Sequence, residues 1–156
     1  MLVIILAAAM ALQTTPPGED PVDPYTQANA NAGAMPFAGT AMLSAFHGKA
    51  GIDRVVEDFV ARINTDKRIS EILEKQDMVR LRRLLKEQFC YILNGGCAYS
   101  GRTMKDAHKN LGIQTADMGA LVEDLQASMR KEKISFFAQN RLLAKLAPMK
   151  RHVVER

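Results

Sequence analysis

The strongest constraint on the fold is the spacing of apolar residues after Leu43. In the first long stretch they fall at positions i, i+3, i+4, i+7, i+8 and i+11, which are Ile52, Val55, Val56, Phe59, Val60 and Ile63. This spacing places them on one face of an α-helix, which turns once in about 3.6 residues. Because no useful run alternates apolar and polar residues as a half-buried strand does, we predict an all-α domain.

Three further helices are predicted from the same spacing and from residues typical of helix ends. The second follows Asp77, whose carboxylate can cap it, and stops at Asn94-Gly95-Gly96, where the left-handed backbone of a helix end is tolerated. The third starts near Thr115 and the fourth near Ser135, with Pro148 bending the fourth late in its course. Residues 95–114 remain as a long loop-rich stretch, which is usually functional or holds a short element of its own.

His108 is the residue of chemical interest in this stretch. Met104, His108 and Leu111 are four and three positions apart, so a short helix would place the imidazole on an apolar face. A structural zinc site needs about four ligands, and the sequence shows no such pattern. Haem needs only one axial ligand, because the porphyrin supplies four others. From the residues alone, an ordinary core or surface histidine remains the more common interpretation.

Two segments before the helical region are predicted to lie outside the fold. Residues 1–12 carry an apolar run that is too short to span a bilayer and fits a secretory signal, with Ala9-Met10-Ala11 as cleavage site. No positive charge precedes the run, so a misplaced start is the alternative. Residues 13–39 are rich in Pro, Ala, Asn and Gly and predict a flexible linker. Export would place the protein in the periplasm or outside the cell; otherwise it is cytoplasmic.

The charge balance argues against nucleic acid as a partner. The net charge is +4, but basic and acidic residues are interspersed, as in Arg130-Lys131-Glu132-Lys133. The densest basic patch is Arg80, Arg82 and Arg83, which we interpret as a solvated helix face or a binder of carboxylates.

Cys90 and Cys97 are seven residues apart. On an unbroken helix their Cα atoms would be about 10.5 Å apart, beyond the ~7 Å limit for a disulfide. The break at Asn94-Gly95-Gly96 lets the chain turn back, so both a disulfide in an exported protein and a pair of reduced thiols remain open.

Three motifs, in this order, resemble the group 1 truncated haemoglobins. They are IDRVVEDFVARI from Ile52, YSGRTMKDAH from Tyr99 to His108, and LAPM from Leu146. The resemblance covers roughly residues 43–154 and implies a truncated globin domain over residues 40–156. Its fold would be a two-over-two helical sandwich around haem b (iron protoporphyrin IX), with His108 ligating the iron.

The resemblance also implies further contacts to haem. Tyr99 and Arg102 are candidates for the haem edge or the propionates. The remaining candidates are apolar residues that match lining positions of the family, for which plain core packing is the alternative: Leu73, Leu81, Leu85, Met104, Met118 and Leu121.

The departures from the family concern the side of the haem where a gas would bind. Many members have a tyrosine where this chain has Val60, a glutamine at Leu85 and a phenylalanine at Leu73. The predicted distal pocket of Val60, Leu81 and Leu85 therefore lacks a hydrogen-bond donor, and Gln88 is the nearest candidate. We expect oxygen to be bound more weakly than in relatives with a donor.

The predicted function is reversible binding of diatomic gases such as oxygen, nitric oxide and carbon monoxide. Nitric oxide dioxygenase or peroxidase-like activity is open, and the former would need an unidentified reductase as partner. For the globin, membrane contact is expected only through an uncleaved N-terminal segment. A helical module of the membrane surface, suggested by the apolar start and the basic helix, is a further alternative. The alternative is a degenerate globin that binds little or no haem and acts through protein contacts, which the loss of the usual phenylalanine at Leu73 favours.

Overall fold

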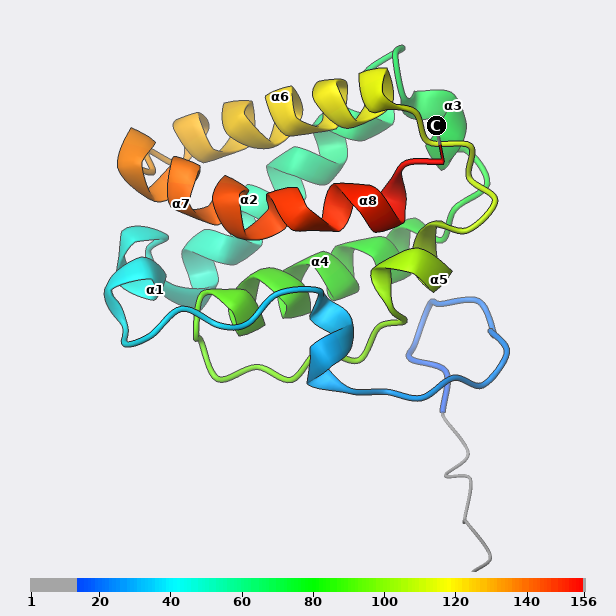
Figure 1. Ribbon diagram of the computed structural model, residues 1–156, viewed down its shortest axis with the longest axis horizontal. Helices are drawn as coiled ribbons and strands as arrows, with labels where there is room; N and C mark the ends of the chain where they lie inside the picture. Colours follow the sequence, from blue (N-terminus) through cyan, green and yellow to red (C-terminus); the bar gives the residue numbers. More distant parts are fainter. Residues whose placement is uncertain (1–13, 156) are drawn as a thin grey trace, which may run out of the picture.

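The computed structural model describes residues 14–155, which form helices and loops without a strand (Figure 1). From the N-terminus the elements are η1 (Asn29–Ala32), α1 (Ala41–Ala45), α2 (Gly48–Thr65), α3 (Ser70–Leu73), α4 (Met78–Ile92), α5 (Met104–His108), α6 (Thr115–Lys131), α7 (Phe136–Leu146), η2 (Ala147–Met149) and α8 (Lys150–Val153). The all-α prediction is confirmed. Among these residues, none of the helices combines the length and the apolar character that a membrane-spanning helix requires.

Helix α2 is the centre of the fold, because it packs against both α4 and α6. Its predicted apolar face is buried at every position, from Ile52 through Phe59 to Ile63. Burial of each such side chain contributes about 1.5–3 kcal/mol, which holds the two neighbouring helices against α2. In Figure 1, α7, η2 and α8 follow one another as a rod, from orange to red, that crosses in front of α2.

The predicted helix ends are confirmed in detail. The carboxylate of Asp77 accepts a hydrogen bond from the backbone N–H of Arg80 at the start of α4. After α4, Asn94 has the left-handed backbone conformation that ends the helix. Ser135 caps α7 by accepting from Ala138, and Pro148 interrupts the rod as part of the 3₁₀ turn η2.

Cys90 and Cys97 form a disulfide, which decides between the two states that the sequence leaves open. The turn after α4 brings their Cα atoms to 5.7 Å from each other. The backbone N–H of Gly95 donates to the carbonyl oxygen of Cys90 at 2.7 Å, and a Cβ on Gly95 would lie 2.7 Å from the Cys90 sulfur. The disulfide therefore ties the loop that leads to α5 to the last turn of α4.

The prediction of a flexible linker over residues 13–39 is wrong for residues 14–39, which pack along the helical domain. Ala32 in η1 is fully buried, and Phe37 is 8% exposed and donates its backbone N–H to the carbonyl of Ile92. We call residues 16–37 the N-terminal strap. The predicted signal segment, residues 1–12, lies outside the described residues.

The strap is attached to the start of α4 through a buried carboxylate. The Glu19 side chain is 1% exposed and accepts hydrogen bonds from the guanidinium groups of Arg80 and Arg83. The backbone N–H of Asp20 donates to the second oxygen of the helix cap Asp77 at 2.8 Å. Two residues of the predicted basic patch, Arg80 and Arg83, thus bind a carboxylate of the chain itself.

Replacing Glu19 with glutamine is expected to lower the free energy of unfolding by about 1–3 kcal/mol at neutral pH, because the buried ion pair is broken. The hydrogen bond from Arg83 lowers the Glu19 pKa below its ordinary 4.5, and burial opposes this shift. A carboxyl group with a lowered pKa stabilises the fold above its ordinary pKa and loses this contribution as the pH falls further.

The difference in unfolding free energy between wild type and Glu19→Gln should therefore shrink below about pH 4.5, as urea unfolding at several pH values would show. Asp23→Asn is the matched control, since Asp23 is an exposed strap acid outside every ion pair in the described part of the chain. Equal stability of the Glu19 variant and wild type at pH 7 would contradict the assigned role.

Candidate functional site

The site is built on α5, the short helix within the loop-rich stretch. Thr103 starts it by accepting a hydrogen bond from the backbone N–H of Asp106 at 3.1 Å. Helix α5 ends at His108 and packs against α8 near the C-terminus. The predicted short helix that contains Met104 and His108 is therefore confirmed.

The imidazole of His108 is held in one orientation by its own helix. Its Nδ1 lies 2.7 Å from the carbonyl oxygen of Met104, one turn earlier. Since a carbonyl can only accept, Nδ1 carries the proton and donates it, which leaves the lone pair on Nε2. A ring fixed through one nitrogen, with the other free to coordinate, is the arrangement of histidine metal ligands in proteins.

Partial burial favours the unprotonated form of this ring. Desolvation lowers the pKa of His108 below its ordinary 6.5, and the hydrogen bond to Met104 opposes the shift. At neutral pH the ring is therefore mostly in the form that coordinates a metal. The described residues contain no group of three or more His, Cys, Asp or Glu that could hold a metal ion. A haem iron needs only one such ligand from the protein, because the porphyrin supplies four others.

The apolar residues predicted to line the cofactor share an intermediate degree of burial. Whereas the side chains on the apolar face of α2 are fully buried, these side chains lie at the edge of the core and are partly exposed. They are Leu73, Leu81, Leu85, Met118 and Leu121. They come from α3, α4 and α6. Met78 and Ile113 belong to the same partly buried group and were not singled out from the sequence.

This apolar edge fits a flat apolar cofactor. Partly exposed leucine and methionine side chains from α3, α4 and α6, together with the partly buried His108, provide surface that a porphyrin ring would cover. Met104 is 8% exposed and lies on the same short helix as the histidine. Val60 is fully buried within α2, and its isopropyl group offers no hydrogen bond.

The structure corrects the role considered for Gln88. This residue is 7% exposed, and its amide nitrogen donates to the carbonyl oxygen of Ala32 in η1 at 2.8 Å. The same nitrogen lies 3.5 Å from the Met104 sulfur and 3.7 Å from the Met149 sulfur. Gln88 thus joins α4 to the strap and to η2, and it is not a free donor for a bound gas.

Tyr99 and Arg102, considered for the haem edge, are engaged in other contacts. Tyr99 is 5% exposed, and its hydroxyl lies 3.5 Å from the carbonyl of Arg102. The Arg102 guanidinium donates to the carbonyl of Asp23 and lies over the Tyr25 ring. Both residues hold the strap and the loop before α5, and their contact with haem remains a prediction.

Met149 and the strap are the parts of the site that sequence analysis missed. Gly33 has a left-handed backbone conformation and lets the strap pass close to two methionine side chains. A Cβ at this position would lie 3.0 Å from the Met149 sulfur and 3.1 Å from Met104 Cγ. The signal in the sequence was weak, because Met149 follows Pro148 in the matched motif but looks like an ordinary core methionine.

Comparisons with known proteins agree with this geometry. The family model described as bacterial-like globin matches residues 42–155. The group 1 truncated haemoglobin of Synechocystis is 32% identical over 88 residues, which cover 54% of this chain and 71% of the relative. That of Nostoc commune is 30% identical over 88 residues, 56% of this chain and 75% of the relative.

Solved structures show the same fold. The truncated haemoglobin of Tetrahymena pyriformis in its Fe(III) form superimposes with a TM-score of 0.70 at 18% identity, over 74% of this chain and 98% of that one. The 2/2 haemoglobin of Synechococcus, solved with covalently attached haem, gives a TM-score of 0.67 at 21% identity, again over 74% and 98%.

Four observations lead to one conclusion: the histidine on its short helix, the apolar edge of the core, the family match and the shared fold. This chain belongs to the bacterial-like globin family and is a haem-binding globin of the group 1 truncated type.

Proposed function

We propose that the protein binds haem b through Nε2 of His108 and reversibly binds diatomic gases. The observation that carries the proposal is the hydrogen bond from His108 Nδ1 to the Met104 carbonyl, which leaves Nε2 free to coordinate. Haem, when bound, supplies an iron with a position open to a small gas. The chain supplies the axial ligand, its orientation and an apolar surrounding.

The residues proposed to lie on the gas-binding side of the haem exclude water but offer no hydrogen bond to a bound gas. Val60, Leu81 and Leu85 carry only hydrocarbon side chains, and the amide of Gln88 is already used by Ala32. Oxygen held in a globin carries partial negative charge, and a charge-assisted donor stabilises it by roughly 1.5–3 kcal/mol. Without this donor, oxygen should be released about one to two decades faster, and carbon monoxide should be less affected.

This apolar pocket favours gas binding over nitric oxide dioxygenation. That reaction needs oxygen to be held until nitric oxide arrives, and it needs an electron donor such as a reductase to restore the reduced state. The absence of a distal donor among Val60, Leu81 and Leu85 shortens the time for which oxygen is held. We therefore propose a carrier or sensor of diatomic gas as the main role.

The disulfide supports a location outside the reducing cytoplasm. Bridges such as Cys90–Cys97 persist in the periplasm and outside the cell, whereas cytoplasmic thiols are kept reduced. Together with the apolar N-terminal run of the sequence, this supports the proposal that the protein is exported.

The proposal is tested by visible spectroscopy and stopped-flow kinetics on protein expressed with an adequate haem supply. We expect a Soret band that shifts when carbon monoxide is added to the reduced protein, and oxygen release about 10–100 times faster than in a relative with a distal tyrosine. Very slow oxygen release would contradict the apolar pocket. Failure to take up haem would contradict the whole proposal and favour a degenerate globin that acts through protein contacts.

A further inference from the structure

The C-terminal part of the chain is free of acidic residues over an unusual length. Residues 133–154 contain five lysines and arginines, one histidine and no aspartate or glutamate. The chain has 17 acidic residues in 156, so an even distribution would place about two in such a stretch. The stretch covers α7, η2 and α8, the rod at the front of Figure 1.

One side of this rod is buried and the other is open. Ala138, Leu142, Met149 and Val153 face the core. The exposed residues continue along the whole rod: Phe136, Phe137, Asn140, Arg141, Ala144, Ala147, Pro148, Lys150, Arg151 and His152. We call this exposed side, together with Lys145, the rod face.

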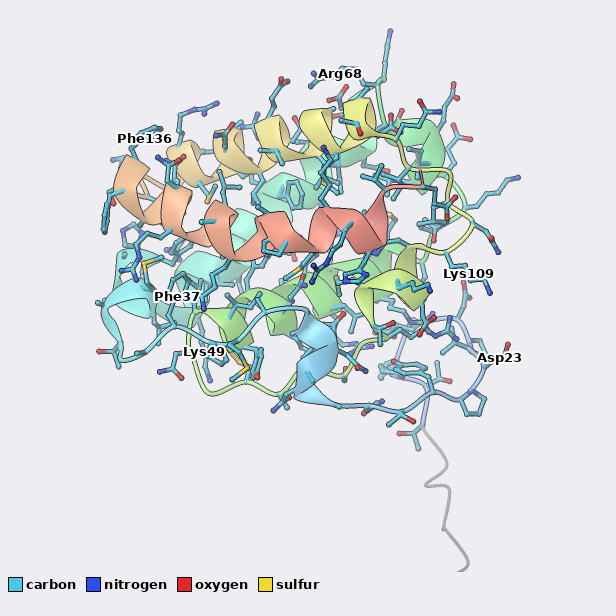
Figure 2. The ribbon with its side chains drawn as sticks, in the orientation of Figure 1. Asp23, Phe37, Lys49, Arg68, Lys109 and Phe136 are labelled. Atoms are coloured by element: carbon cyan, nitrogen blue, oxygen red, sulfur yellow. A yellow bond between two sulfur atoms is a disulfide. The ribbon has the colours of Figure 1, made fainter. Side chains whose placement is uncertain are left out.

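Two adjacent aromatic rings stand at one end of the rod face. Phe136 is 73% and Phe137 71% exposed, although phenylalanine is usually buried. Figure 2 shows Phe136 at the end of α7, directed away from the body of the molecule. The Arg141 guanidinium lies 5.7 Å from the centre of the Phe137 ring and 5.0 Å from that of Phe37, so cationic and aromatic groups share this end.

Within the described part of the chain, no ion pair neutralises the cations of the rod face. Every ion pair among residues 14–155 lies elsewhere, with cations from residues 47–131. The acids at the two ends of the stretch are engaged: Glu132 pairs with Arg54 and His47, and Glu155 accepts from the backbone of Asn110 and Gly112. The positive charge of the rod face is therefore directed to solvent.

The far end of the rod face adds a shallow hollow of about 470 Å³. It is lined by small apolar groups and by cations: Ala147, Pro148, Lys150, Arg151 and Val154. Such a surface combines room for a headgroup with positive charge beside it.

We propose that the rod face docks on an anionic lipid surface. A helix with aromatic groups and lysine or arginine on one side is attracted to anionic lipid by about 1 kcal/mol for each cation near the surface. The two phenyl rings are exposed at the end of the rod and insert among lipid chains without requiring a shaped cavity. A protein partner would need a matching pocket for both rings, so lipid is the occupant that these observations favour.

Docking in this orientation would bring the site close to the membrane. Helix α8 packs against α5, which carries His108, so a single layer of helix would separate the lipid from the residue proposed to hold the iron. Diatomic gases dissolve better in hydrocarbon than in water. The docking itself rests on surface residues and does not depend on the proposed gas binding.

The test is co-sedimentation of the full chain with vesicles of phosphatidylcholine alone or with phosphatidylglycerol added. Binding is expected only with the anionic lipid and should weaken as salt is raised from about 0.1 to 0.5 M. Arg141→Gln with Arg151→Gln should reduce binding by roughly tenfold or more. Phe136→Ser with Phe137→Ser should also weaken it, and these exposed positions leave folding intact.

Matched controls separate the rod face from general positive charge. Lys67→Gln with Lys75→Gln removes two exposed cations outside the rod, and Val79→Ser removes an exposed apolar side chain on α4. These variants should bind anionic vesicles within about twofold of wild type. Equal losses in control and rod-face variants, equal binding to neutral vesicles, or self-association through Phe136 without vesicle binding would each overturn the proposal.

Discussion

Protein in which His108 is replaced by glycine is expected to lose most of its haem. Loss of an outer partner of a metal ligand already weakens metal binding about 10–100-fold, and loss of the ligand itself should cost at least as much. The Soret absorbance for each protein chain would fall accordingly. The reason lies in the geometry, because Nδ1 is held by the Met104 carbonyl, which leaves Nε2 as the atom proposed to coordinate the iron.

Added imidazole should restore the spectrum of the His108→Gly variant. The glycine leaves space where the ring was, and free imidazole supplies the same nitrogen ligand. A protein that merely unfolded would not respond in this way, so rescue distinguishes coordination from stability.

The matched control for this experiment is Ala107→Gly. Ala107 is an exposed neighbour on α5, and its change to glycine costs about 1 kcal/mol of helix propensity, at least as much as the change at His108, without loss of a ligand. It should keep its haem. Retention of haem and of the carbon monoxide shift in His108→Gly would mean that another residue ligates the iron.

Replacing Leu85 with glutamine is expected to slow oxygen release about 10–100-fold. The two side chains have similar volumes, and Leu85 is only partly buried at the edge of the core, so the change installs an amide donor with little packing cost. An N–H directed at the bound gas would add roughly 1.5–3 kcal/mol of stabilisation. Carbon monoxide, which carries less charge, should respond less.

Stopped-flow measurement of oxygen dissociation from the reduced protein checks this prediction. Val79→Gln is the control, because Val79 is exposed on the same helix and lines a groove between α2 and α4. It should leave oxygen release unchanged. An unaltered rate in Leu85→Gln would place Leu85 away from the gas, and a slow rate in the wild type would reveal a donor other than Gln88.

The helices and the site histidine were predictable because their signals are local. The apolar face from Ile52 to Ile63 and the cap at Asp77 each depend on residues within a few positions of one another. The short helix that contains Met104 and His108 was predictable for the same reason. The proposal that His108 ligates the iron needed the resemblance to a family, since a single histidine on an apolar face has no unique meaning.

The strap was mispredicted because its contacts are remote in the sequence. Glu19 is more than 60 residues from Arg80 and Arg83, and the Asn29 side chain accepts from the backbone of Tyr99, 70 residues away. Residues 14–39 show no apolar period, because they are held by single polar side chains and by two buried anchors, Ala32 and Phe37. A composition rich in Pro, Gly and Asn resembles that of a flexible linker for the same reason.

By itself, the sequence determined an all-α domain, the course of its four main helices and a histidine on a short apolar turn, since periodicity and caps act within one or two turns of helix. Only the tertiary structure decided that residues 14–39 pack on the domain, that the Gln88 amide donates to the Ala32 carbonyl and that Cys90 forms a disulfide with Cys97. These outcomes depend on which distant groups share the interior, where a buried polar atom must find a partner. Local spacing carries no information about that choice.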